Sequence, residues 1–389
     1  MRQLLSGTFG LYASRIPALL VFFLAGWIVN YQLLRFAGYV ANIDAVYGYL
    51  VLPLAILARI ASYVAMFLVL RPGKSFLDSL SSSILPFLVV FATWGMLQDD
   101  WVGFSLAQLE QRRYDGTDPD LFFGVTPITV GIVVVAFALR LVIRKHAEKL
   151  PKWFSFVAAY LEVVWIFIAI DIIGQVTAWV MAWVNTRVFV VWVQGVIGDI
   201  GEIVVPLRWI ADATGWLVGQ AGVLLGEPLA WLTLAGIVYA VTSPYASPTR
   251  LGTAARNRLE RLPKFFRSRL AEVGTDFAGR WVPIAQAARL IWRAGVITMA
   301  FFVLAYAVLD TSSDWLFIGI NQLIGPHDIS FWRGTETLLN LSVAAIVEPL
   351  RISLIAATWA YCLTLSDAGR TELGLEQKQR GESVRAPQP

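Results

Sequence analysis

The residues of this chain that could do chemistry are charged side chains inside long apolar runs. A charge at membrane depth is costly, so it pairs with another group, faces a water-filled cavity or takes part in function. The clearest case is Glu336–Leu365, an apolar stretch that Glu348 and Arg351 interrupt. The candidates for a binding site or an ion pathway are Arg59, Glu162, Asp171, Glu227, Glu348 and Arg351.

The spacing of these charges limits how they can be arranged. Glu348 and Arg351 are three residues apart, so they share a helix face and can neutralise each other. Glu162 and Asp171 point to opposite sides of a helix that turns about 100° per residue, so an unbroken helix cannot aim both at one pathway. We expect Glu162 to reach Lys152 or the membrane surface.

Asp171 is the deeper of these two carboxylates. The sequence offers Arg59 or Arg351 as its partner. Functional charges and charges that only neutralise one another fit this pattern equally, and the sequence leaves both alternatives open.

Pro349 follows Glu348 well inside the last apolar run. A proline within a helix removes a backbone hydrogen bond and frees a carbonyl one turn back. Transporters use interrupted helices of this kind to build a binding site at the middle of the membrane, and Glu348 would then lie at a helix N-terminus, where the dipole favours a carboxylate. A kink that serves only packing explains the same residues.

Enzyme motifs are absent from the sequence. It has no complete Gly-x-x-x-x-Gly-Lys-Ser/Thr phosphate loop, no nucleophile elbow and no His-Glu-x-x-His motif. Two histidines are too few for a His-rich metal site, and the single cysteine, Cys362, lies in an apolar run. We therefore expect no catalytic residue, no metal site and no cofactor.

Acidic residues between the apolar runs leave two weaker alternatives open. Oxygen ligands in a flexible loop suit Ca²⁺, although solvated acids explain the same composition. A lipid-modifying enzyme would need Asp118, Asp314 or His327. The candidates for a divalent cation are Asp99, Asp100, Asp115, Asp118 and Asp120.

The composition is that of a membrane protein. Of the 389 residues, 57% are apolar and 15% are charged, whereas a soluble domain carries about 25% charged residues. Several runs exceed the ~18 apolar residues that call for a bilayer, and they are continuous rather than alternating, which favours helices over a barrel. The predicted fold is an all-α, polytopic transmembrane helical bundle of eight spans, at 16–37, 46–70, 80–98, 125–143, 154–182, 223–242, 290–309 and 338–364.

The distribution of charge predicts the orientation in the cell membrane. Lysine and arginine gather at the N-terminus, in 71–79, 140–152 and 249–293, and after residue 366, which places both termini in the cytoplasm. The pI of about 9.2 therefore reflects one basic membrane surface and indicates no nucleic-acid partner. The loops predicted on the outer side are acidic, with Asp44, Asp99, Asp100, Glu110, Asp115, Asp118, Asp120, Asp310, Asp314, Asp328 and Glu336.

Four regions follow from this topology. Residues 1–243 hold the first six spans, and 183–222 within them could be interfacial, re-entrant or spanning. Residues 244–289 form a cytoplasmic basic segment, 290–365 the last transmembrane hairpin, and 366–389 a disordered polar tail.

The basic segment has the apolar spacing of an amphipathic helix over 249–280. Such a helix beside a membrane lies on anionic lipid headgroups, and docking of a cytoplasmic partner is the alternative. The residues expected at the lipid surface are Arg256, Arg258, Arg261, Lys264, Arg267 and Arg269.

A short pattern recurs four times along the chain. Each helix predicted to run inwards carries a proline followed by Leu or Ile, and each preceding helix carries a tryptophan near its outer end. Four helical hairpins derived from one duplicated module explain the pattern, and chance agreement of common membrane residues is the alternative. The prolines are Pro53, Pro127, Pro228 and Pro349, and the tryptophans are Trp27, Trp101, Trp179 and Trp315.

The repeats, the interrupted spans and the buried charges together predict a transporter, or the membrane subunit of a transport or envelope complex. A non-catalytic scaffold that recruits partners through the basic helix, and a lipid-modifying enzyme, are the alternatives. The expected partners are membrane lipids, including anionic lipids on the cytoplasmic side, and a membrane protein or a second copy of the chain.

Overall fold

The computed structural model is mostly helical where it describes the chain. It describes residues 2–71, 75–112, 126–146, 149–151, 153–192, 209, 213–216, 219–220, 222–240 and 294–383, and this part contains no strand. The helices are α1 (Arg2–Ala41), α2 (Ala45–Leu70), α3 (Phe76–Thr93), α4 (Met96–Arg112), α5 (Pro127–Lys145), α6 (Phe154–Asn185), α9 (Glu227–Ala240), α12 (Val296–Ile324) and α13 (Ile329–Ser383). A π-helix, Gly222–Gly226, leads directly into α9.

Seven of the described helices are long and apolar enough to cross a membrane, so the chain has the architecture of a multi-pass membrane protein. The prediction of an all-α, membrane-type fold is confirmed. The candidate spans are Leu4–Ala41, Ala45–Leu70, Phe76–Thr93, Pro127–Lys145, Phe154–Asn185, Val296–Ile324 and Ile329–Leu365.

Two predicted spans differ from the helices observed. The span predicted at 223–242 corresponds to the shorter apolar helix Leu224–Tyr239. The span predicted at 80–98 is instead α3, which ends at Thr93, and a second helix, α4, begins at Met96.

The last hairpin also differs, because its predicted loop at 310–337 is mostly helical. The turn lies at 325–328 instead, between α12 and α13. Polar residues within α12 bond to their own helix: the hydroxyl of Ser312 donates to the Leu309 carbonyl, and that of Ser313 to the Asp310 carbonyl. The five polar residues at 310–314 therefore lie inside a helix.

Helix α13 continues to Ser383, past residue 366, where the predicted polar tail begins. Residues 384–389 lie outside the described part, and the disordered tail stays a prediction. Glutamate, glutamine, lysine, arginine and leucine between 372 and 380 are good helix formers, so α13 can continue without an apolar face.

Side-chain caps fix where two of the helices begin. The carboxylate of Asp44 accepts a hydrogen bond from the Val46 backbone N–H at the start of α2. Thr126 and Thr129 form a capping box ahead of α5, with Pro127 in its first turn.

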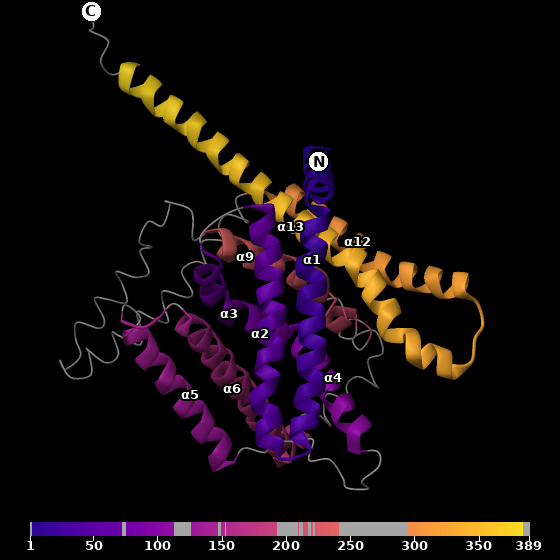
Figure 1. The fold of residues 1–389 in the computed structure, drawn as a ribbon. Helices are drawn as coiled ribbons and strands as arrows, with labels where there is room; N and C mark the ends of the chain where they lie inside the picture. The colour runs from indigo at the N-terminus through magenta and orange to yellow at the C-terminus, as the bar shows by residue number, and fades with distance from the viewer. Residues whose placement is uncertain are drawn as a thin grey trace, which may run out of the picture. The chain divides into compact units, whose positions relative to one another are not determined.

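The contacts divide the chain into two compact units. Unit 1 contains Met1–Phe23, Val64–Ser82 and Trp231–Pro389, and unit 2 contains Leu24–Tyr63 and Ser83–Ala230. In unit 1, α12 and α13 form an antiparallel hairpin (Figure 1). The Tyr239 hydroxyl of α9 donates to the Phe67 carbonyl at the end of α2.

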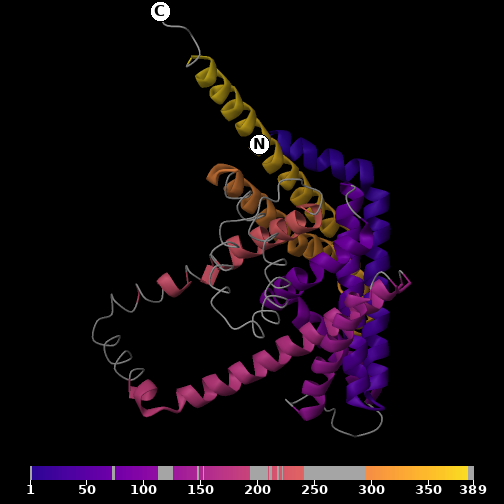
Figure 2. The ribbon, with the colours of Figure 1, turned by 90° about the vertical axis from the view of Figure 1, so that its left-hand side faces the viewer.

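In unit 2, α5 and α6 lie side by side (Figure 1). Helix α6 has 32 residues and α5 has 19, and Figure 2 shows α6 as a long helix whose far end extends away from the rest of the unit. Trp179 and Trp183 near that end are exposed.

Most of two predicted regions cannot be compared with the structure. The basic segment 244–289, with its six lipid-surface candidates, lies outside the described residues, and so does most of 193–221. The acidic stretch that holds Asp115, Asp118 and Asp120 also lies outside them.

Candidate functional site

A break in the helical chain separates α3 from α4 at Trp94 and Gly95. Gly95 has a φ of 81°, a left-handed conformation that glycine adopts without the strain a Cβ would add. The Trp94 N–H still donates to the Val90 carbonyl of α3, and the Asp99 N–H donates to the Gly95 carbonyl at the start of α4. The last carbonyls of one helix and the first N–H groups of the next are therefore adjacent.

Helices α3 and α4 together run antiparallel to α2. Tyr63 of α2 stacks on Phe87 of α3 and meets Phe91 edge-on. Nearer the start of α2, Tyr49 meets Trp101 and Phe104 of α4. Later residues of α3 and α4 thus meet earlier residues of α2, so α3 and α4 form one broken helical element that runs antiparallel to α2.

A buried ion pair lies beside this break. Nη1 of Arg59, near the middle of α2, donates to Oδ1 of Asp100 at 3.0 Å and to the Met96 carbonyl at 3.3 Å. The side chain of Asp100 is 4% exposed and that of Arg59 is 29% exposed. Arg59 also lies over the ring of Phe91, 5.8 Å from its centroid.

Helix α1 supplies the third member of this cluster. Nδ2 of Asn30 donates to Oδ1 of Asp100 at 3.3 Å and to the Ala55 carbonyl of α2 at 3.0 Å. Asn30, Arg59 and Asp100, which we call the break cluster, thus join α1, α2 and α4. Their hydrogen bonds offset part of the cost of desolvating two charges.

The placement of Asp100 corrects the prediction from sequence. We expected it in an acidic outer loop, but it lies on α4 and is buried. The loop was inferred because Asp99 and Asp100 directly follow an apolar run, whereas the chain continues as a polar helix that packs against α1 and α2.

A second irregular helix touches the break. The π-helix Gly222–Gly226 ends against Trp94, because a Cβ on Gly226 would lie 3.1 Å from the Trp94 ring. π-Helical turns within α-helices are frequent at functional sites.

A second buried ion pair joins α5 and α6. Nε of Arg140 lies 3.4 Å from Oε2 of Glu162, and the two side chains are 4% and 6% exposed. Glu162 therefore lies beside Arg140, whereas Lys152, the partner expected from sequence, lies outside the described residues. Arg140, taken from sequence as an inner-surface residue, lies one helix away and is buried.

A third cluster, in unit 1, confirms that Glu348 and Arg351 pair on one helix face. Nη1 of Arg351 donates to Glu348 at 2.9 Å, and Nη2 donates to Asp310 of α12, also at 2.9 Å. Arg351 also lies over the Tyr306 ring, 5.3 Å from its centroid. Asp310, predicted in a loop, is a helical residue that is 58% exposed.

The remaining candidates have modest surroundings. Asp171 accepts a hydrogen bond from Gln175 at 2.8 Å, one turn along α6. Its proposed partners, Arg59 and Arg351, bind other carboxylates, so that pairing is wrong. Glu227 is the first residue of α9, where the helix dipole favours an acid.

The structure gives no support to a hydrolytic site at Asp314 and His327. Asp314 lies on α12 and His327 in the turn after it, separated by about 15 Å of helix. His327 stacks on Phe331 with ring centroids 4.3 Å apart. No group of three potential metal ligands occurs among the residues that the structure describes.

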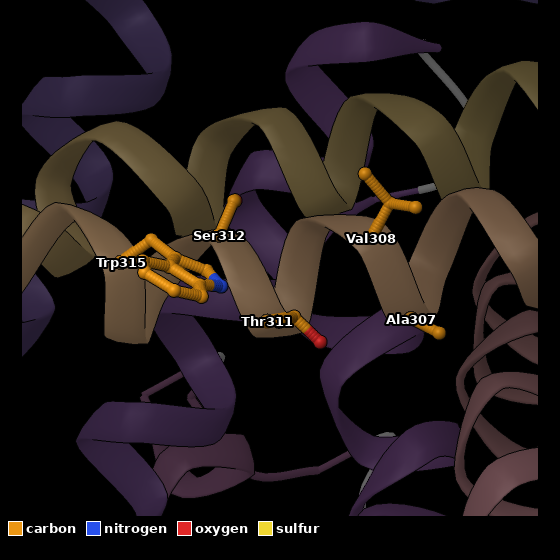
Figure 3. Close-up of a pocket in the computed structure, with 5 residues that line it drawn as sticks. All are labelled: Ala307, Val308, Thr311, Ser312 and Trp315. Carbon is orange, nitrogen blue, oxygen red and sulfur yellow. The ribbon is translucent and has the colours of Figure 1, made fainter.

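A shallow groove follows the surface of α12. Figure 3 shows that five side chains line it and that all come from this one helix. Since no second element adds a polar group, the groove has no built binding site. The lining residues are Ala307, Val308, Thr311, Ser312 and Trp315.

Sequence reasoning missed Asn30 and the break itself, and it named Asp100 only as a candidate cation ligand in a loop. Trp94-Gly95 at the end of an apolar run, followed by a segment that mixes polar residues with Trp101 and Phe104, was the available signal. Asn30 lies in an apolar run, where a polar residue that needs a partner is also informative.

Comparison of the chain with known protein families, with curated proteins and with solved structures gave no match.

Proposed function

We propose that the protein is a membrane transporter, or the membrane subunit of a transport complex, with its solute pathway at the break between α3 and α4. The observation that carries this proposal is a helix broken beside a buried Arg59–Asp100 pair. In transporters, interrupted helices supply half-helix ends and freed backbone groups that bind solute near the middle of the membrane.

The chemistry of the break suits a polar or charged solute. Arg59 is partly exposed and offers a cation, while Asp100 offers a carboxylate with one oxygen that has no hydrogen-bond partner in the described part of the chain. A solute that competes for either group would alter the contact between α2 and α4. The nearby π-helix is a second irregular backbone segment that could move with it.

The proposed topology has eight crossing elements in the cell membrane, with both termini in the cytoplasm. We count α3 and α4 as one broken crossing and the shorter helix at Leu224–Tyr239 as another. Four hairpins result: α1 with α2, α3 and α4 with α5, α6 with α9, and α12 with α13. The second helix of each hairpin carries the recurring proline.

Flux through reconstituted vesicles tests the proposal. Wild-type protein in vesicles of neutral and anionic lipid is assayed against a panel of labelled amino acids, sugars, nucleosides and inorganic ions. We expect at least one solute to cross faster than in protein-free vesicles, and Asp100→Asn and Arg59→Gln to abolish that flux.

The matched control is Glu110→Gln on the same helix. Glu110 forms only an exposed contact with Arg35 at 4.0 Å, so its loss should leave the flux unchanged. If flux survives Asp100→Asn, the break cluster is not part of the solute pathway. A wild-type protein that moves no member of the panel would favour the non-catalytic scaffold.

A further inference from the structure

Helix α4 carries buried polar atoms that have no hydrogen-bond partner among the residues that the structure describes. They are Oδ2 of Asp100, Oγ of Ser105, and both Oε1 and Nε2 of Gln108. Asp100 is 3% exposed and Gln108 is 1% exposed. Buried polar groups in native proteins are bonded to protein or to ordered water, so these atoms point to a ligand.

These atoms lie on one side of α4. At about 100° per residue, Asp100, Ser105 and Gln108 fall within a sector of about 140°. Asp100 lies beside the break and Gln108 lies two turns nearer the Arg112 end. The polar atoms therefore form a row along the second half of the broken crossing.

Helices α1 and α2 pack closely beside the row, so we look for a small ligand. Gly38 of α1 packs so closely that a Cβ there would lie 2.8 Å from the Gln108 backbone nitrogen. Tyr49 of α2 covers Trp101 and Phe104, between the two ends of the row. Water fits both the size and the chemistry, because it can donate to the carboxylate and the amide oxygen and accept from the amide N–H.

We infer that ordered water binds along Asp100, Ser105 and Gln108 and joins Asp100 to the Arg112 end of α4. The inference deepens the proposed function by naming an ion that can reach the break, namely a proton. A proton from the solvent enters the row at the Arg112 end, each water receives one proton and passes one on, and the last water protonates Oδ2 of Asp100, so the waters are unchanged and the side chain becomes a neutral acid. The binding of water along α4 does not depend on the protein being a transporter.

Protonation of Asp100 changes its interaction with the charges around it. Among the described residues, Arg59 of α2 and Asp99 of α4 act on the Asp100 carboxyl, and Asn30 of α1 donates a hydrogen bond to it. Protonation removes the negative charge that holds Arg59, so the link between α2 and α4 weakens when the proton arrives.

Hydroxyl-radical footprinting of the intact protein in lipid nanodiscs tests for this water. Radicals formed from bound water oxidise adjacent side chains even where bulk solvent has no access. Phe104 is 2% exposed and lies one turn from both Asp100 and Gln108, whereas Phe87, nearer the start of α3, is fully buried. We expect Phe104 to be oxidised several times faster than Phe87.

The substitution Gln108→Leu provides a second test of the bound water. With water present, the substitution slows oxidation of Phe104 to the rate of Phe87 and does not raise the melting temperature. If the amide is dry, replacing it with an apolar group removes a desolvation cost, so the melting temperature rises. Slow oxidation of Phe104 in wild type, or a higher melting temperature for Gln108→Leu, would overturn the inference.

These outcomes are separate from those of the vesicle assay. If Phe104 is oxidised but no solute flux is found, the water site is supported and the transport function is not. Flux that depends on Asp100 without a footprint retains the transporter and removes the water row.

Discussion

The two buried ion pairs of unit 2 use the same chemistry in different backbones. Arg140 and Glu162 bridge α5 and α6, two continuous helices, with both side chains almost fully buried. Arg59 and Asp100 bridge α2 and α4 beside a helix break, with Arg59 29% exposed and an Asp100 oxygen that has no partner among the described residues. The first pair has the features of a clamp between two helices, and the second combines a partly exposed guanidinium with a buried carboxylate.

The difference shows that a charge at membrane depth does not by itself mark a site. What distinguishes the break cluster is its surroundings: an interrupted backbone, an accessible cation and orphaned polar atoms. The Arg351 cluster of unit 1 lies between these cases, because Glu348 and Arg351 are mostly buried while Asp310 is exposed.

Removing one member of the α5–α6 pair should have the largest effect on stability. Glu162→Gln leaves Arg140 buried without its counter-charge, and we expect a loss of about 3–5 kcal/mol. The melting temperature of the protein in detergent, followed by tryptophan fluorescence, measures it. A loss as small as that of an exposed charge would mean that the pair is not a clamp.

Replacing both members of each pair by apolar residues separates the two roles. Buried ion pairs can often be exchanged for apolar residues of similar volume without loss of stability. We expect Arg140→Met with Glu162→Leu to fold and keep its flux. Arg59→Met with Asp100→Leu should fold but lose the solute flux. Equal flux from both double variants would mean that the two ion pairs do not differ in function.

Close packing of α1 on α4 predicts the next largest effect. A Cβ at Gly38 would lie 2.9 Å from the Ala107 carbonyl carbon, so Gly38→Val forces the helices apart at a cost of about 1–3 kcal/mol. Gly7 has open space around it, so Gly7→Val controls for the effect of replacing a glycine in the same helix. Equal melting temperatures for Gly38→Val and Gly7→Val would contradict the packing.

Asn30→Ala probes the break cluster without removing a charge. Losing the two hydrogen bonds from Nδ2, to Asp100 and to Ala55, should cost about 1–2 kcal/mol. The flux should fall further than this loss explains, because Asp100 loses a contact that orients it. An unchanged flux with a lower melting temperature would assign Asn30 a structural role only.

Loss of the cap of α5, the helix that holds Arg140, should have a smaller effect on stability. Thr126→Ala removes the capping box with Thr129 and should cost about 1 kcal/mol. Since this cap lies far along α5 from Arg140, the flux should not change. A loss of flux would show that the α5–α6 hairpin takes part in transport.

The smallest effect is expected at the surface. Arg35 and Glu110 lie 4.0 Å apart with side chains 51% and 69% exposed, so Glu110→Gln should change the stability by less than about 0.5 kcal/mol. A larger shift in melting temperature would show that this end of α4 is more constrained than its exposure indicates.

Apolar periodicity and length predicted most of the fold. Continuous apolar runs predicted the helices, since a span must satisfy its own backbone. The break at Gly95 and the helical course of 310–324 were missed because polar residues after an apolar run look like a loop. In both places, contacts made within a helix or with distant helices override that local signal.

The site was predicted less well, because partners come from distant parts of the chain. Glu348 and Arg351 could be paired from spacing alone, as both lie on one helix face. Arg59 with Asp100, and Arg140 with Glu162, depend on which helices are neighbours, and a single sequence does not contain that information. Asp171 was assigned wrong partners for the same reason.

Access of a water-soluble thiol reagent to the break tests the central claim most directly. Cys362 is buried and is the single cysteine, so Cys362→Ala gives a cysteine-free background. In it, Thr93→Cys and Gln98→Cys flank the break, while Val134→Cys, on α5, has a side chain 60% exposed away from it. We predict that a membrane-impermeant methanethiosulfonate labels Thr93→Cys and Gln98→Cys in lipid vesicles but not Val134→Cys. Equal absence of labelling at all three positions would contradict a solute pathway at the break.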